Sequence, residues 1–202
     1  QGITVSFVDA RSGSNARGGD AGNTVQQIKG DWCVCTIPLS ILSQLDVQVG
    51  APMKQAIAAV HYAAAFKVGL QFKHRFWEED EAIFGGISYT DLPIGQISYP
   101  SNNFNSNGPA VLLGGYGYES THAYEFTAMA PKDRIRAAVE FGSQLHPQYR
   151  EAFQNGVAVG WHRVPWMLGC YGVWTEETRL QHYANLCAVD GRVVLAGEHA
   201  SY

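Results

Sequence analysis

A strict two-residue alternation in "AFKVGLQFK", residues 65–73, constrains the fold more than any other feature of the sequence. Large apolar side chains occupy every second position: Phe66, Val68, Leu70 and Phe72. The positions between them are polar or small: Lys67, Gly69, Gln71 and Lys73. A period of two puts each set on one face, so the segment predicts a β-strand buried on one side. Lysine is rarely buried, so the simplest interpretation turns Lys67 to water, and the alternative holds it over a ligand.

Two strands are predicted near the start, in "ITVSFVDA" (residues 3–10) and in "VQQIKGDWCVCTIP" (residues 25–38). A segment rich in Gly, Ser, Asn and Asp joins them, which favours a hairpin. "WCVCTIP" is apolar on both faces, as in a strand buried inside a layered α/β arrangement. Short β runs between residues 83 and 119 are separated by Gly, Pro and Asn, and they predict a mixed or antiparallel sheet. A last strand is expected at residues 193–196.

Three helices are predicted from periodicity and end signals. The first opens at Pro52, and the second runs from Pro131 to a stop at Pro147. The third follows Thr175, which suits the N-cap position. The apolar positions recur at helical spacing: Met53, Ala56, Ile57 and Val60 in the first helix, and Ile135, Ala138 and Val139 in the second.

The composition excludes several classes of function. Of 202 residues, 46% are hydrophobic and 16% charged, with a net charge of -4, so no basic cluster points to nucleic acid or an anionic membrane surface. No apolar run approaches the roughly 20 residues that cross a bilayer. The seven histidines show no metal-ligand spacing, so no metal site is expected. The four cysteines are expected to be free, buried thiols: Cys33, Cys35, Cys170 and Cys187.

Aromatic residues gather beside glycines in "GWHRVPWMLGCYGVW" and "LLGGYGYE". Glycine lets a backbone approach closely, so such segments could wall a flat ligand. The other interpretation is that the tryptophans and tyrosines fill the core, and composition alone favours it.

The whole chain resembles the C-terminal portion of the flavin-dependent L-amino acid oxidases, within the monoamine oxidase family. The resemblance depends on four motifs in order: the lysine strand with "FWEED", then "TDLP", then "YPSNNF", and finally "AGEH" in "GRVVLAGEHASY". "W-x4-W-x3-C-Y", from Trp161 to Tyr171, occurs in the same order as in that family. The resemblance implies an α/β (α+β) fold. Residues 1–59 and 187–202 would belong to a Rossmann-like FAD-binding domain, and residues 60–186 to a substrate-binding domain with a mixed sheet and covering helices.

The resemblance also implies roles for individual residues. Lys67 would be catalytic, lying under the flavin and holding a water against ring atom N5. Tyr116 would bind the substrate carboxylate, with Tyr118 as the alternative if the alignment shifts. Tyr171 would wall the substrate side-chain pocket, and Trp174 would extend that wall.

Cofactor contacts are implied for a second group of residues: Trp161, Trp166, Gly197, Glu198 and Cys170. The two tryptophans would pack near the flavin ring, and the Gly-Glu turn would meet the ribityl-phosphate region of FAD. The cysteine matches a position that is joined covalently to the flavin in animal monoamine oxidases. The amino acid oxidases usually bind FAD without that bond, so non-covalent FAD is expected.

The implied reaction is hydride transfer from the substrate Cα–H to the flavin. The imino acid then hydrolyses to a 2-oxo acid and ammonia, and O2 reoxidises the flavin with release of hydrogen peroxide. The partners would be an L-amino acid and O2, with neither nucleic acid nor membrane. The rivals are a monoamine or polyamine oxidase, a tryptophan 2-monooxygenase-like enzyme, and a non-catalytic flavin-fold fragment.

Three features of that family are missing from the sequence. These are the nucleotide-binding βαβ with G-x-G-x-x-G, an arginine that clamps the substrate carboxylate, and the helix after "GEHASY". The chain is therefore expected to be a fragment or one subunit. The missing N-terminal segment or a companion chain would complete the enzyme, which would itself be a homo-oligomer.

Overall fold

The chain forms two compact units, which are described separately. The structure, a computed structural model, describes residues 2–8, 25–119 and 121–201. The first unit comprises Gln1–Val60 with Trp174–Tyr202, and the second comprises His61–Val173. The predicted boundary at 186/187 therefore lies 13 residues too late. Helix α7 (Glu176–Cys187) packs against α2 (Ala51–Ala59), and this contact places it in the first unit.

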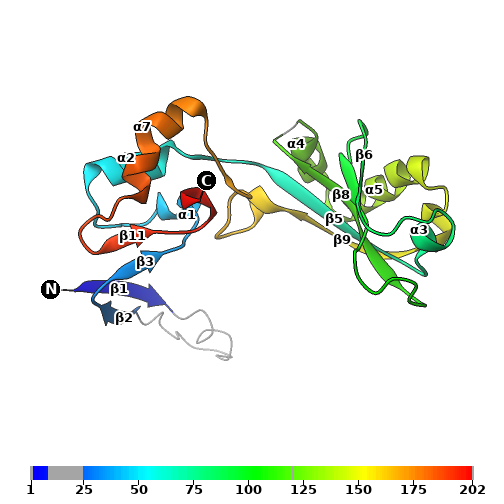
Figure 1. Cartoon of the computed structure of the whole chain (residues 1–202), viewed down its shortest axis with the longest axis horizontal. Helices are drawn as coiled ribbons and strands as arrows, with labels where there is room; N and C mark the ends of the chain where they lie inside the picture. Colours follow the sequence, from blue (N-terminus) through cyan, green and yellow to red (C-terminus); the bar gives the residue numbers. More distant parts are fainter. Residues whose placement is uncertain (1, 9–24, 120, 202) are drawn as a thin grey trace. The chain divides into compact units, whose positions relative to one another are not determined.

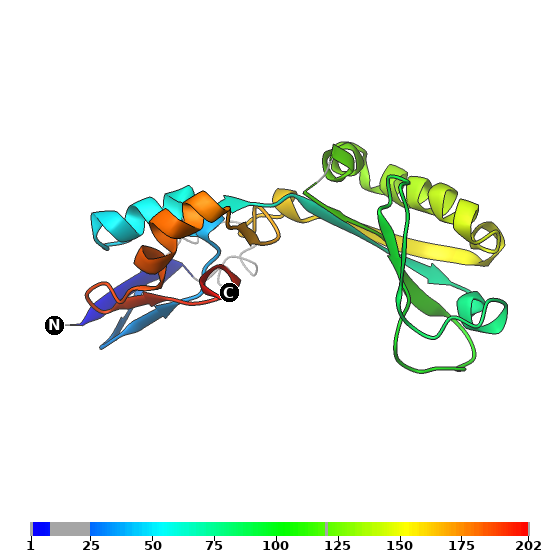
Figure 2. The same ribbon diagram turned by 45° about the horizontal axis from the view of Figure 1, so that its top comes forward.

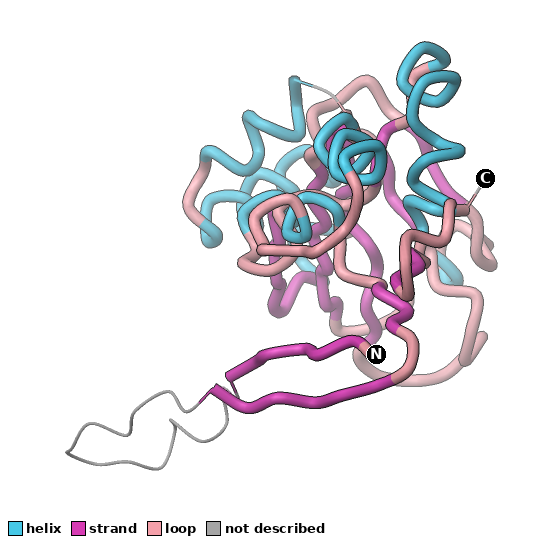
Figure 3. The backbone as a smooth tube through the Cα atoms, turned by 90° about the vertical axis from the view of Figure 1, so that its left-hand side faces the viewer, coloured by secondary structure: helices cyan, strands magenta, loops and turns pink. Residues whose placement is uncertain are grey.

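The first unit combines small sheets with helices. Strands β1 (Ile3–Val8) and β2 (Val25–Gly30) pair antiparallel, which confirms the hairpin (Figure 3), and its turn lies outside the described residues. Strand β3 (Cys33–Cys35) pairs in parallel with the predicted last strand, β11 (Val193–Leu195). The prediction that this strand is buried on both faces was wrong, because the Val34 side chain is 64% exposed.

The helices of the first unit begin where their end signals predict. Helix α2 buries Met53, Ala56 and Ile57. Thr175 caps α7 through a hydrogen bond that its side chain accepts from the Thr178 backbone N–H. Two short helical segments complete the unit: α1 (Leu39–Leu42) and η2 (Glu198–Ala200). No helix in the described part of the chain is long and apolar enough to cross a membrane.

The second unit is built on a five-stranded sheet with the order β6-β7-β8-β5-β9 (Figure 1). The strands are β5 (Ala65–Phe72), β6 (Ile87–Tyr89), β7 (Gln96–Ser98), β8 (Ala110–Tyr118) and β9 (Phe153–Gly160). Each neighbouring pair is antiparallel. Of the two arrangements that the short β runs predicted, the antiparallel sheet is therefore found, and the mixed sheet implied by the resemblance is not. A second small pairing joins β4 (His61–Tyr62) to β10 (Gly172–Val173).

The core lies on one face of this sheet. The four alternating apolar side chains of β5 are completely buried, as their spacing predicts. Helices α4 (Thr121–Ala128) and α5 (Pro131–Leu145) cover this face (Figure 2), and the Phe66 ring stacks on Phe126 with centroids 4.4 Å apart. The opposite face carries Lys67, which is exposed. Helix α4 and strand β9 were not predicted.

Two of the motifs that carry the resemblance, "FWEED" and "YPSNNF", are joined by a buried ion pair that stabilises the fold. Helix α3 (Phe76–Glu79) follows Arg75, whose buried guanidinium lies 2.6 Å from a carboxylate oxygen of Glu78. Arg75 also donates to the Asn102 carbonyl, and the Asn105 backbone N–H donates to Glu78. The buried ion pair therefore ties "FWEED" to "YPSNNF".

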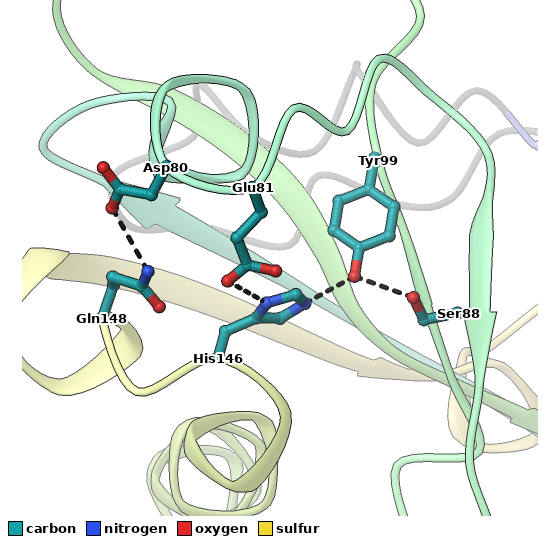
Figure 4. A network of polar contacts seen from close by, with 6 residues as sticks. All are labelled: Asp80, Glu81, Ser88, Tyr99, His146 and Gln148. Carbon is teal, nitrogen blue, oxygen red and sulfur yellow. Dashed lines mark hydrogen bonds and ion pairs between the residues drawn. The ribbon is translucent and has the colours of Figure 1, made fainter.

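A buried polar chain fixes the C-terminal end of α5 (Figure 4). His146 lies between Glu81, 2.7 Å from Nδ1, and the Tyr99 hydroxyl, 2.5 Å from Nε2. Ser88 continues the chain at 2.9 Å from that hydroxyl. The chain crosslinks three segments of the second unit, and helix α6 (Tyr149–Ala152) follows it and leads into β9.

Candidate functional site

Lys67 lies on the exposed side of β5, between β8 and the edge strand β9. In the register of β5 it lies opposite Tyr116 on β8 and opposite Val159 on β9. Its Nζ is 4.9 Å from the centre of the Tyr116 ring, within the range of a cation–π contact. The small residues Ala65 and Gly69 flank it at the i±2 positions of the same face. The ammonium group thus rises from a part of the strand with little side-chain bulk.

A pocket of about 230 Å³ opens beside this lysine, entirely within the second unit. Seven residues line it: Ala65, Lys67, Tyr116, Trp161, Met167, Cys170 and Tyr171. Five of them are predicted site residues, brought together from two strands, the 3-10 helix η1 (Trp161–Arg163) and the segment that follows it. The other two, Ala65 and Met167, were missed, because no motif or spacing distinguishes them from core residues.

Backbone hydrogen bonds fix the wall made by Cys170 and Tyr171. The Cys170 N–H donates to the Ala63 carbonyl, and the Ala63 N–H donates to the Tyr171 carbonyl, each at 3.0 Å. A Cβ at Gly169 would lie 2.5 Å from the Cβ of Tyr62, so only glycine permits this close approach. The glycine in "MLGCY" is therefore needed to bring the two side chains to the pocket.

Glycines also explain how β8 presents its tyrosines. A Cβ on Gly117 would lie 2.5 Å from Cε1 of Phe66, and one on Gly114 would lie 2.4 Å from Cδ1 of Leu70. These glycines admit core side chains on the covered face of β8. Tyr116 and Tyr118, two residues apart, share the other face, with ring centres 5.3 Å apart.

Burial raises the pKa of both pocket tyrosines above a value at which a phenol is already protonated near neutral pH. Burial raises the pKa of Tyr116, and the neighbouring Cys170 and Tyr118 add to the rise. Burial also raises the pKa of Tyr171, further strengthened by its hydrogen bond to Glu119. The Tyr171 hydroxyl donates to Oε1 of Glu119 at 2.7 Å. Both phenols therefore stay neutral hydrogen-bond donors near neutral pH.

Four predicted site residues do not line the pocket. Trp166 is 76% exposed, at a backbone φ of 68°. Trp174 belongs to the first unit, where its indole N–H donates to the His199 carbonyl at 3.0 Å. An edge contact with Tyr183 also holds its ring, and its expected place in the Tyr171 wall stays a prediction. Gly197, at φ 125°, and Glu198 also lie in the first unit, both exposed.

The cysteines and the other potential metal ligands of the described residues do not form a metal site. None of the four cysteines, all of which lie in the described part of the chain, forms a disulfide, and they are less buried than expected, because Cys187 is exposed and the other three are only half-buried. Among residues 2–8, 25–119 and 121–201, no three His, Cys, Asp or Glu side chains gather as a cation would require. The chemistry that this pocket offers is one ammonium group, the phenolic donor of Tyr116, a thiol and an aromatic wall.

The chain is similar to flavoenzymes along almost its full length. Residues 5–202 match the family model described as flavin containing amine oxidoreductase. An L-amino-acid oxidase of Siganus canaliculatus is 30% identical over 205 residues, covering 100% of this chain and 37% of that protein. The flavin-dependent L-tryptophan oxidase RebO of Lentzea aerocolonigenes is 28% identical, covering 99% of this chain and 43% of that protein.

The solved structures extend the similarity to the fold. Cyclohexylamine oxidase from Brevibacterium oxydans IH-35A superposes with a TM-score of 0.74 at 16% identity, covering 89% of this chain and 40% of that enzyme. At this identity the likeness concerns the fold alone. The chain thus spans less than half the length of each of these three proteins.

Proposed function

Since this chain belongs to the flavin-containing amine oxidoreductase family, we propose that it forms the substrate pocket of an enzyme that oxidises L-amino acids. The expected α/β (α+β) fold of that family and its flavin cofactor, FAD, are confirmed. The observation that carries the proposal is the single pocket joining Lys67, Tyr116 and Tyr171. Homologues near 30% identity that are named L-amino-acid oxidases support the substrate class.

The residues of the second unit fit one side of a flat, electron-poor ring. Ala65 and Gly69 leave the strand surface low on both sides of Lys67, and Trp161 supplies an aromatic wall. When bound, the flavin supplies the two-electron oxidation of a carbon–nitrogen bond, which no side chain here can perform. We propose that Lys67, with its ammonium on the exposed face, holds a water molecule at the reacting edge of that ring.

Tyr116 is proposed to bind the substrate carboxylate. Its raised pKa keeps the phenol protonated, so the hydroxyl can donate a charge-assisted hydrogen bond to a carboxylate. Lys67, 4.9 Å from the same ring, adds a positive field at this end of the pocket. Both features favour substrates with a carboxylate over simple amines.

Tyr171 is proposed to position the substrate side chain and to exclude water. The hydrogen bond to Glu119 occupies its hydroxyl, so the ring rather than the phenol faces the pocket. Cys170 lies beside it in the pocket lining, and FAD bound without a covalent bond to this cysteine stays a prediction. Contacts from Trp161, Trp166, Gly197 and Glu198 to the cofactor stay predictions.

An amine oxidase is the second candidate function. Tyr116, Tyr118 and Tyr171 form a continuous aromatic surface, with ring centres 5.3 and 6.3 Å apart, and aromatic faces attract cations. Such a surface can hold an amine that has no carboxylate. The two candidates differ in whether the Tyr116 hydroxyl contributes to binding.

The test is peroxide production by the flavin-loaded protein and its Tyr116→Phe variant, with L-amino acids and with the matching decarboxylated amines. We expect turnover of L-amino acids, and a KM about tenfold higher in the variant, the loss of one hydrogen bond to a charged group. Turnover of amines alone, unchanged by Tyr116→Phe, would establish the second candidate. A 2-oxo acid and peroxide in equal amounts would separate an oxidase from a monooxygenase.

A further inference from the structure

Glu119 places a carboxylate at the rim of the aromatic pocket. It follows the last residue of β8, in the left-handed region at φ 49°, where few residues other than glycine are found. Its backbone N–H donates to the Ala64 carbonyl at 3.0 Å, next to the strand that carries Lys67. Its Oε1 accepts from the Tyr171 hydroxyl, so Glu119 lies one phenol ring away from the pocket.

This carboxylate has no cationic partner among the described residues. None of the ion pairs of the structured segments includes Glu119, and its side chain is exposed. Its hydrogen-bond donor, Tyr171, is neutral and leaves the negative charge intact. A carboxylate held next to aromatic rings is a favourable environment for an ammonium or guanidinium group.

The aromatic surface connects this carboxylate to the other end of the pocket. Tyr171 contacts Tyr118 edge-on, with ring centres 6.3 Å apart, and Tyr118 is next to Tyr116. Lys67, the cation that lines the pocket, lies at the Tyr116 end. The pocket is therefore positive where Tyr116 would meet a carboxylate. The Glu119 carboxylate lies outside the pocket lining, beyond the Tyr171 ring, on the side where the substrate side chain would end.

We infer that Tyr118, Tyr171 and Glu119 form a cation subsite, and that the preferred substrates are L-amino acids with a positively charged side chain. This inference rests on the proposed function for the orientation of the substrate. Lys67 repels a side-chain cation and Glu119 attracts it, so both charges favour the same orientation. Acidic side chains would meet the opposite forces and be rejected.

The first test compares L-lysine with L-norleucine, which has the same carbon chain without the terminal ammonium. We expect kcat/KM to favour L-lysine about tenfold in the flavin-loaded protein, the size of one cation–π contact plus one charged contact. Glu119→Gln keeps the size of the side chain and can still accept from Tyr171. It should lower kcat/KM for L-lysine several-fold more than for L-norleucine, mainly through KM, because the charged contact is lost and the cation–π contact remains. Glu140→Gln, on the exposed face of α5, is the matched control and should change neither.

The second test measures by calorimetry how tightly 6-aminohexanoate and hexanoate bind. Neither probe has an α-amino group, so binding is measured without turnover. These probes carry the carboxylate and differ only in the terminal ammonium. We expect the first to bind about tenfold more tightly, and Glu119→Gln to reduce the difference to the part that the cation–π contact supplies.

The outcomes separate the inference from the function on which it rests. Equal use of L-lysine and L-norleucine, or an equal effect of Glu119→Gln on both, overturns the cation subsite and leaves the oxidase proposal intact. If no L-amino acid is oxidised, the oxidase proposal fails. The subsite then stands only if 6-aminohexanoate binds more tightly than hexanoate, and equal binding of the two probes overturns it.

Discussion

Gly117 is a position where one added methyl group should disturb the strand that carries Tyr116 and Tyr118. Its ideal Cβ would lie 2.5 Å from Cε1, 3.1 Å from Cζ and 3.4 Å from Cδ1 of Phe66. That ring is completely buried and stacked on Phe126 at an interplanar angle of 4°, so it cannot retreat without moving α4. Overpacking of this kind costs about 1–3 kcal/mol, and the lower entropy of the unfolded alanine chain recovers about 0.4–1 kcal/mol. Gly117→Ala should therefore lower the free energy of unfolding by about 1–2 kcal/mol.

The assay is urea unfolding of the purified protein, followed by tryptophan fluorescence, with Gly69→Ala as the matched control. A Cβ on Gly69 would meet Val157 and Val111 at 3.5 and 3.9 Å, which are ordinary contacts. The control should lie within about 0.5 kcal/mol of the parent or be slightly more stable. Equal unfolding free energies for Gly117→Ala and the parent would refute the reasoning, as would equal losses in the two variants.

Three further predictions follow from the buried polar groups and from the pocket thiol. Tyr99→Phe leaves Nε2 of His146 without its partner and should cost about 1–3 kcal/mol in urea unfolding, and an unchanged midpoint would contradict the buried chain. Glu78→Gln breaks the buried pair with Arg75 and should cost about 3 kcal/mol. The hydrogen bond from Arg75 lowers the pKa of Glu78 in the folded protein. The ionised Glu78 therefore contributes its full stabilisation above its unfolded pKa, and this stabilisation is lost as the pH falls through the folded pKa. Over that pH range the parent should lose stability and Glu78→Gln should not. Denatured protein should carry no flavin fluorescence on a gel, and a fluorescent band lost in Cys170→Ser would show a covalent link.

Sequence periodicity was enough for elements whose burial is one-sided. The alternation around Val68 predicted a strand, and proline and threonine signals placed α5 and α7, because each pattern reports a local period or a helix end. Helix α4 was missed because its sequence, "THAYEFTA", has no sharp apolar stripe and folds through tertiary contacts such as the Phe126 stack.

The site was predicted through the resemblance rather than through periodicity. Lys67, Tyr116 and Tyr171 are 49 and 55 residues apart along the chain, and no local rule places them in one pocket. Tyr118 could have been inferred as a neighbour from the two-residue spacing on β8. Glu119 could not, because its contact with Tyr171 depends on how the chain turns after the strand.

The most direct test of the account is to mix the flavin-loaded protein with an L-amino acid without oxygen and to record the absorbance of the flavin at about 450 nm. The account predicts bleaching by the L-enantiomer and not by the D-enantiomer, with half-saturation at about tenfold higher substrate concentration in Tyr116→Phe. Bleaching that is unchanged by Tyr116→Phe, or that is equally fast with the decarboxylated amine, would contradict the assignment of this pocket to amino acid oxidation.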